Sequence, residues 1–141
     1  MTALRLVLFR CGEQVFAVEA GTVREIVVSD LPTRVPGSGG AVLGLVNVRG
    51  TLVTVVDAAA AVGLAAGDRR GGSVILVERR SRPVGLLVDE VLDLVTVDAG
   101  ALDETAALPG VRRDLVRAVG TAAGRSFVHL ATDVLLEPLL P

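Results

Sequence analysis

Two pairs of short segments set the architecture of this chain: Val15-Phe-Ala-Val18 with Val23-Arg-Glu-Ile-Val27, and Val84-Gly-Leu-Leu-Val88 with Val91-Leu-Asp-Leu-Val95. Each segment is a few residues long and rich in valine, a composition that favours β-strands over helices. Because one pattern recurs in both halves of the chain, we interpret it as an internal duplication. The alternative is that a Val-rich β protein shows such similarities through its composition alone.

Segments of this kind continue along the chain, about five in each half, separated by turn residues. The expected strands are Leu4–Arg10, Gln14–Val18, Val23–Val28, Val42–Val48, Thr51–Val56, Ser73–Glu78, Pro83–Val88, Val91–Val97, Leu115–Gly120 and Ser126–Leu130. Helical signals are limited to Ala58–Leu64, which Asp57 would cap, and to Val134–Glu137. Five short strands suffice to close a small barrel. We therefore expect one all-β domain over residues 4–137, with a first barrel over roughly 15–72 and a second over roughly 73–130; an exchange of terminal strands between them is left open.

The composition excludes several classes of protein. Of the 141 residues, 51% are hydrophobic and 21% are charged, so disorder over the whole chain is excluded. A formal net charge of −2 and the lack of Trp and Tyr argue against nucleic-acid binding, which needs basic charge and aromatic stacking. The single cysteine, Cys11, forbids an intrachain disulfide, and no apolar run is long enough to span a membrane. We expect a cytoplasmic protein without direct membrane insertion.

The side chains needed for catalysis are scarce. His129 is the only histidine, and Ser126 in the same expected strand is not placed to aim its hydroxyl at the imidazole. We expect this histidine to be hydrogen-bonded or half exposed. One histidine and one distant cysteine do not make a metal site. Asp57 is followed by alanines, so we interpret it as a helix cap rather than a catalytic acid. We expect no enzymatic activity, no cofactor and no metal.

Three polar features are not explained by folding alone. Asn47-Val-Arg49-Gly50 lies between two apolar strands, where Gly50 suits a turn with positive φ and Asn47 can bond backbone groups. The planar guanidinium of Arg49 could hold two loops or a partner carboxylate, or it could be a solvated side chain on a hairpin turn. Carboxylates at matching points of the two halves, in Val23-Arg-Glu-Ile26 and Val88-Asp-Glu-Val91, are interpreted as solvated charges at strand edges.

These stretches resemble the CheW-like domain family of bacterial chemotaxis. Gly44-Leu-Val-Asn-Val-Arg-Gly50 followed by Val53-Thr-Val-Val-Asp57 is similar to the family pattern GxxNxRGxxxPVxDL. Pro83-Val-Gly-Leu-Leu-Val-Asp-Glu-Val-Leu-Asp-Leu94 resembles its second pattern, VGLxVDxVxxV. Leu6–Val18 with Val23–Ile26 is similar to the family's first hairpin and following strand, so the resemblance covers about residues 4–137.

The resemblance implies two pseudo-symmetric five-stranded SH3-like barrels and no catalysis. Such proteins are adaptors that bridge the cytoplasmic hairpins of methyl-accepting chemoreceptors to the regulatory domain of a CheA-type histidine kinase. The receptor tip would dock between the barrels, and the kinase domain would pair barrel to barrel with the first half. The positions that match the family's receptor contacts are Val23, Glu25, Gly44, Arg49, Gly85, Val91 and Leu94. The protein would be cytoplasmic and recruited to receptor arrays at the inner face of the membrane.

The chain departs from the family pattern at two points. After the Arg-Gly turn it reads Thr54-Val-Val-Asp57-Ala, where the family often has Pro before the Val or Ile. The expected loop Asp98–Gly110 contains no aromatic residue, although its counterpart contacts the kinase in arrays. The alternative function is therefore a divergent CheW-like module that regulates or inhibits a kinase in a pathway other than chemotaxis. Gly37–Gly40 and Gly67–Gly72 are expected to be mobile surface loops.

Overall fold

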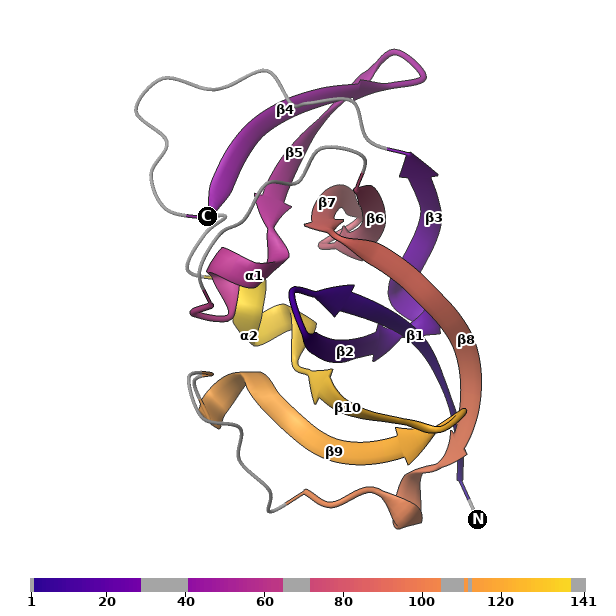
Figure 1. The fold of residues 1–141 in the computed structure, drawn as a ribbon. Coiled ribbons are helices and arrows are strands. Elements are labelled where there is room, and N and C mark those ends of the chain that lie inside the picture. Colours follow the sequence, from indigo (N-terminus) through magenta and orange to yellow (C-terminus); the bar gives the residue numbers. More distant parts are fainter. Residues whose placement is uncertain (1, 29–40, 65–71, 105–110, 112, 138–141) are drawn as a thin grey trace.

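A computed structural model describes residues 2–28, 41–64, 72–104, 111 and 113–137 (Figure 1). Its strands are β1 (Ala3–Cys11), β2 (Gln14–Glu19), β3 (Val23–Val28), β4 (Val42–Val48), β5 (Thr51–Asp57), β6 (Ser73–Arg79), β7 (Arg82–Val88), β8 (Glu90–Asp98), β9 (Val116–Ala122) and β10 (Arg125–Leu130). Its helical elements are α1 (Ala58–Ala61), α2 (Thr132–Leu136) and the short 3-10 helices η1 (Ala20–Thr22), η2 (Ala99–Ala101) and η3 (Arg113–Leu115). Every expected strand is present with slightly different ends, and the all-β fold is confirmed.

The strands form two five-stranded sheets, in the orders β8-β1-β2-β10-β9 and β3-β6-β7-β5-β4. Both sheets follow one scheme. A hairpin, β1–β2 or β6–β7, pairs antiparallel with an edge strand on one side, β8 or β3, and parallel with β10 or β5 on the other. Each half of the chain therefore lends its first hairpin to the sheet that holds the last three strands of the other half. The duplication seen in the sequence is present in the structure as this repeated scheme.

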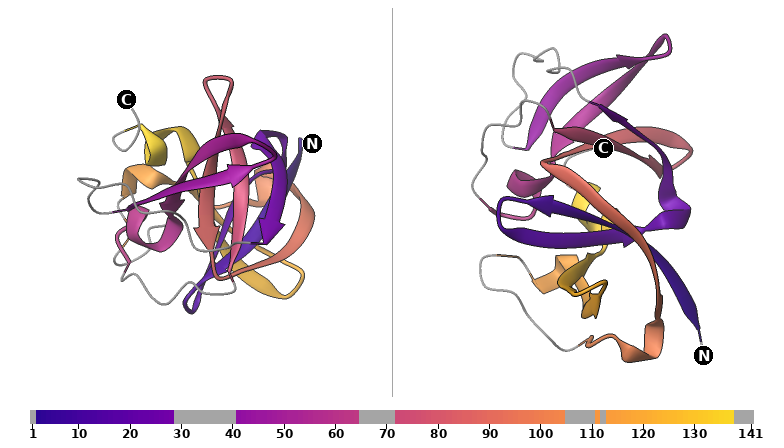
Figure 2. Two further views of the ribbon diagram at one scale, coloured as in Figure 1. Left: turned by 90° about the horizontal axis from the view of Figure 1, so that it is seen from above. Right: turned by 45° about the vertical axis from the view of Figure 1, so that its right-hand side comes forward.

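This exchange changes the expected division of strands between the barrels. Boundaries at 15–72 and 73–130 would put β2 in the first barrel and β6 and β7 in the second. Instead β2 lies beside β10, and β6 and β7 lie between β3 and β5. The chain changes sheets at η1, between β2 and β3, and again at the bend between β7 and β8. Neighbours in sequence thus enter different sheets, which lie one above the other in Figure 1 and in the right-hand view of Figure 2.

Three hydrophobic cores hold the strands. The central core lies between the sheets and includes Phe9, Phe16, Val56, Ile75, Val77, Val84, Leu86 and Leu136. A second core lies inside the sheet that strands β3 to β7 form, called the β3–β7 sheet below. It consists of Val53, Val55, Val74, Leu76 and Leu87. A third, inside the other sheet, consists of Leu6, Leu8, Ala17 and Phe127. Because side chains alternate along a strand, neighbours such as Ile75 and Leu76 serve different cores, and the strands therefore have nearly continuous apolar sequences.

Asp57 caps α1, as the sequence predicts. Its side chain is buried, and its Oδ1 accepts hydrogen bonds from the backbone N–H groups of Ala59 (3.0 Å) and Ala60 (3.4 Å). The helix ends at Ala61, earlier than the expected Leu64. In the second half the equivalent cap position is Ala131, whose side chain makes no capping bond to α2.

Several expected loops fall beyond this description. Gly37–Gly40, nearly all of Gly67–Gly72 and residues 105–110 lie outside the described residues. The described part of the stretch Asp98–Gly110 contains η2 and an isolated β-bridge between Asp103 and Val119. Within the part of the chain that the structure describes, no helix has the length and apolar character to cross a membrane.

Candidate functional site

The turn between β4 and β5 presents Arg49 at the surface. Arg49 and Gly50 both have positive φ, 50° and 83°, which is the pattern of a tight hairpin turn that matches the twist of the strands. The backbone N–H of Gly50 donates to Asn47 Oδ1 at 2.8 Å. The expected roles of Gly50 and Asn47 are therefore confirmed. The positive φ of Arg49 was not expected.

Arg49 pairs with Glu25 of β3. Its Nη1 donates a hydrogen bond to Glu25 Oε1, and this bond, followed by the charge of Glu25, raises the pKa of the Arg49 guanidinium above its ordinary value. The Arg49 side chain is 76% exposed, while that of Glu25 is 28% exposed. The pair thus ties the β4–β5 turn to β3 and leaves most of the guanidinium accessible to a partner. The sequence left open whether Arg49 joins two segments of the chain, binds a partner carboxylate or is solvated. In this structure it joins two segments of the chain.

A hollow of about 260 Å³ adjoins this ion pair. It lies at the end of the β3–β7 sheet and is lined by Glu25, Arg49, Val48 and Leu76, among others. Arg24, which also borders it, lies 3.8 Å from Glu78 of β6. The hollow is therefore lined by both apolar and charged side chains, a combination that can hold a protein segment in one register.

The edge strands β3 and β8 carry most of the candidate residues. They occupy equivalent places in the two sheets and lie on the same side of the molecule (Figure 1). When Val23–Val27 is aligned with Val91–Val95, Ile26 of β3 matches Leu94 of β8, and these side chains are 44% and 50% exposed. Val23 and Val91 are partly buried and pack against the central core. The duplication thus places an exposed apolar side chain at a matching position on each edge, and β3 carries a second one, Val28, which is 85% exposed.

Two of the candidate receptor contacts are interior residues. Gly44 is buried at a β-bulge of β4, with φ of 150°. Gly85 is buried in β7, and a Cβ added there would lie 2.7 Å from Cγ1 of Val74. Both glycines shape the β3–β7 sheet beneath the surface, because a larger residue does not fit at Gly85 and strains the backbone at Gly44. The structure therefore gives both glycines a role in packing, and their part in receptor binding stays a prediction.

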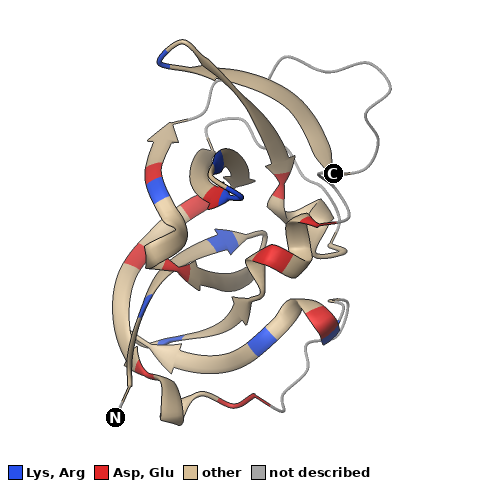
Figure 3. Ribbon diagram, turned by 180° about the vertical axis from the view of Figure 1, so that it is seen from behind, with Lys and Arg blue, Asp and Glu red and all other residues tan. Residues whose placement is uncertain are grey.

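The matching carboxylates are bound rather than simply solvated. Glu25 is held by Arg49, and Asp89, between β7 and β8, accepts hydrogen bonds from the backbone N–H of Gly12 at 2.6 Å and from Nη1 of Arg10 at 3.4 Å. Asp89 thus fastens the tip of the β1–β2 hairpin to the bend that leads into β8. Figure 3 shows acidic and basic residues interspersed over the strands rather than gathered on one face. The interpretation of these carboxylates as solvated charges was wrong for Glu25 and Asp89.

The described residues offer no catalytic arrangement. Ser126 is exposed, whereas His129 is 4% exposed, so the two side chains of β10 do not meet. His129 Nε2 is buried without a hydrogen-bond partner among the described residues, which contradicts the expectation of a bonded or half-exposed histidine. Burial lowers the pKa of His129, against a smaller raising effect of Glu19. Within the described segments no group of three or more His, Cys, Asp or Glu residues could hold a metal ion.

Comparisons with known proteins agree with this arrangement. The CheW-like domain model matches residues 5–138. A protein described as "Probable chemotaxis protein CheW" from Rhizobium etli is 38% identical over 113 residues, which is 79% of this chain and 71% of the relative. "Chemotaxis protein CheW" from Rhizobium meliloti is 37% identical over 130 residues, 91% of this chain and 84% of the relative. The crystal structure of the scaffolding protein TtCheW from Thermoanaerobacter tengcongensis has a TM-score of 0.84 at 21% identity, covering 96% of this chain and 94% of that one. This chain belongs to the CheW-like domain family, and it is a non-enzymatic adaptor of the chemotaxis type.

Proposed function

We propose that this protein couples the cytoplasmic hairpins of methyl-accepting chemoreceptors to the regulatory domain of a CheA-type histidine kinase. It acts in the cytoplasm and is recruited to receptor arrays at the inner face of the membrane. It transmits receptor state as a coupling free energy between two bound partners, so it needs no catalytic group.

The observation that carries this proposal is the matched pair of exposed apolar residues on β3 and β8. Ile26 and Leu94 lie at equivalent points of the two repeats, one on each sheet, and the strands that carry them, β3 and β8, lie on the same side of the molecule in Figure 1. An amphipathic helix docks by burying such apolar side chains in a surface that also has charged groups to fix its register. Glu25 and Arg49 supply those charges next to β3.

The kinase domain would bind at a second surface. Among the described residues β4 pairs with β5 only, so one edge of β4 is available to pair with another chain. Because the regulatory domain of such kinases has a similar fold, we infer that it packs against the β3–β7 sheet at this edge. The receptor and kinase surfaces would then share one sheet.

A binding titration tests the proposal. The purified protein is titrated with a receptor cytoplasmic hairpin and with the CheA regulatory domain from the same genome, separately and together. Arg49→Ala and Leu94→Ser alter the two sheets independently, and each should weaken receptor binding several-fold; kinase binding should be unchanged by Leu94→Ser, which lies on the sheet away from β4. Arg125→Ala, at the exposed start of β10, is the matched control and should leave both affinities unchanged.

The proposal is overturned if the wild-type protein binds neither partner; the module would then serve another pathway, such as regulation or inhibition of a different kinase. If Arg49→Ala greatly lowered the melting temperature, Arg49 would be a structural residue, and unchanged receptor binding by a folded Leu94→Ser variant would then refute the docking surface.

A further inference from the structure

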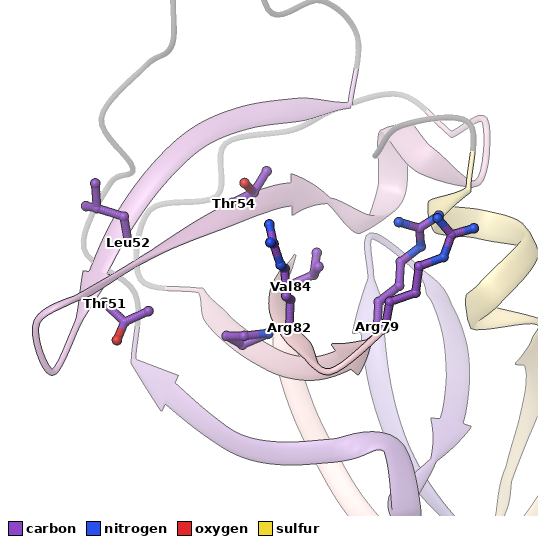
Figure 4. Close-up of a pocket in the computed structure, with 8 residues that line it drawn as sticks. Thr51, Leu52, Thr54, Arg79, Arg82 and Val84 are labelled. Carbon is purple, nitrogen blue, oxygen red and sulfur yellow. The ribbon is translucent and has the colours of Figure 1, made fainter. Parts of the chain in front are cut away.

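A second hollow, of about 560 Å³, lies beside the tip of the β6–β7 hairpin. Three of the residues that line it are Arg79, Arg80 and Arg82, which we call the arginine rim. Leu52 and Thr54 of β5 form part of the opposite wall, and Arg82 points toward Thr54 (Figure 4). The hollow therefore joins a basic wall to a partly apolar one.

The register of the sheet explains why these residues share one face. Val84 of β7 pairs with Val77 of β6, and both side chains belong to the central core. Two residues nearer the hairpin tip, Arg82 pairs with Arg79 on the same face, because side chains alternate along a strand. The central core thus ends in arginines at this side of the protein.

The arginine rim has unmatched positive charge. Arg24 and Arg49 lie within 4.0 Å of a carboxylate, whereas none of the three rim arginines does so among the described residues. The whole chain has a formal net charge of −2, so this local excess is not a general property of its surface. Guanidinium groups favour carboxylate partners, to which they can donate two parallel hydrogen bonds.

The rim is also bordered by apolar surface. Leu52 is 64% exposed, one of the most exposed large apolar side chains of the described residues. The hollow shares Thr51 and Pro83 with the one beside Glu25 and Arg49, but the two open on different faces of the sheet, since Val84 belongs to the central core and Leu76 to the core inside the sheet.

We propose that the arginine rim binds an acidic segment of a protein partner, with carboxylates on Arg79, Arg80 and Arg82 and an apolar side chain on Leu52. This inference rests on the proposed function, because it assumes that the partner at this end of the sheet is a protein. Guanidinium groups also bind phosphate, but a phosphate group by itself makes no use of the exposed Leu52, whereas a protein segment can contact both. A membrane surface is also a poorer match, because basic clusters that bind anionic lipid have more charges than this one.

A labelled Glu-rich peptide with a central leucine tests the inference by fluorescence anisotropy. The control peptide has Gln in place of each Glu. The variant Arg79→Gln/Arg80→Asn/Arg82→Gln removes the rim charge, and asparagine at position 80 suits its positive φ of 51°. Leu52→Ser tests the apolar wall by itself, and Arg125→Gln is the control for charge.

The Glu peptide should bind the wild-type protein and the Arg125→Gln variant equally. Binding should weaken about tenfold with the rim variant, since three exposed ion pairs together account for a change of that order. It should weaken with Leu52→Ser, with the Gln peptide and at high salt. Circular dichroism melts would establish that each variant is folded.

Equal binding of the Glu and Gln peptides, or unchanged binding of the rim variant, would overturn the inference. It would also be overturned if neither peptide bound while phosphatidylglycerol vesicles or inorganic phosphate did so through the rim. If the Glu peptide bound through the rim but no receptor or kinase fragment bound at all, the inference would stand and the proposed coupling function would fail.

Discussion

Replacement of Gly85 by alanine would put a methyl group into the core inside the β3–β7 sheet. The added Cβ would lie 2.7 Å from Val74 Cγ1, 3.1 Å from Val55 Cγ2 and 3.7 Å from Leu76 Cδ2. The first two distances are shorter than the optimum of about 3.5–4.0 Å between carbon atoms. Valine side chains are stiff at χ1, so relief requires movement of the backbone. We expect Gly85→Ala to reduce the free energy of unfolding by about 1–3 kcal/mol, the usual cost of overpacking.

A second substitution shows whether this clash is the cause. Val74→Ala alone leaves a cavity and is destabilising. In the Gly85→Ala background the space vacated by Val74 accepts the new methyl group. The two substitutions should therefore couple favourably, and the double variant should be more stable than the sum of the single effects predicts by about 1–2 kcal/mol.

The assay is urea unfolding followed by far-UV circular dichroism, because the chain has no Trp or Tyr for fluorescence. Gly21→Ala is the matched control, since nothing lies within 4 Å of a Cβ added at that exposed glycine, and its effect should stay within about 0.5 kcal/mol. The packing argument is refuted if Gly85→Ala unfolds at the same urea concentration as the wild-type protein, or if its effect and that of Val74→Ala simply add. Unchanged stability combined with lost receptor binding would make Gly85 a contact residue after all.

Other substitutions test the cap of α1, the hydrogen bond of Asp89 to the β1–β2 hairpin and the buried His129. Asp57→Ala removes the α1 cap and should lower the free energy of unfolding in urea by about 1–2 kcal/mol. Asp98→Ala, at the surface turn η2, should lower it by less, and equal losses would contradict the importance of burial for the cap. Asp89→Ala removes the acceptor for the backbone N–H of Gly12 and should accelerate amide hydrogen exchange at the β1–β2 tip. Unchanged exchange would refute the idea that Asp89 holds this hairpin in place. Because burial lowers the pKa of His129, the unfolded chain takes up the proton first, so stability should fall as the pH drops below about 6.5. His129→Gln should reduce this slope of the urea midpoint, and an identical slope would refute the assignment.

The strands and the first helix cap were predictable because their signals are local. Valine-rich segments between turn residues mark strands wherever they lie, and Asp57 before a run of alanines is sufficient to mark a cap. The turn at Asn47–Gly50 was predictable for the same reason, since its key hydrogen bond joins residues three apart. In each case the residues that make the interaction are close in sequence, so no knowledge of the tertiary fold is needed.

The exchange of hairpins was not predictable in the same way. It depends on which sheet each strand joins after η1 and after Asp89, and that choice is set by packing against a central core assembled from both halves. The partners of the charged residues depend on it as well. Arg10 and Asp89 are 79 positions apart, and Glu25 and Arg49 are 24 apart, so their pairing appears only when the strands are placed. Residue type showed that these groups carry charge but did not show what they bind.

The hairpin exchange also bears on the proposed coupling of two partners by an adaptor of this size. Strand β2, in one sheet, is separated from the edge strand β3 of the other by η1 alone, and Phe16 and Val18 of β2 are fixed in the central core. The same holds for β7 and β8 through Asp89. Neither sheet can move far without disturbing the core that both share, because a close-packed interior transmits strain rather than absorbing it. A partner on the β3 and β8 edges and another on β4 would thus act on one packed unit, which is what coupling without catalysis requires.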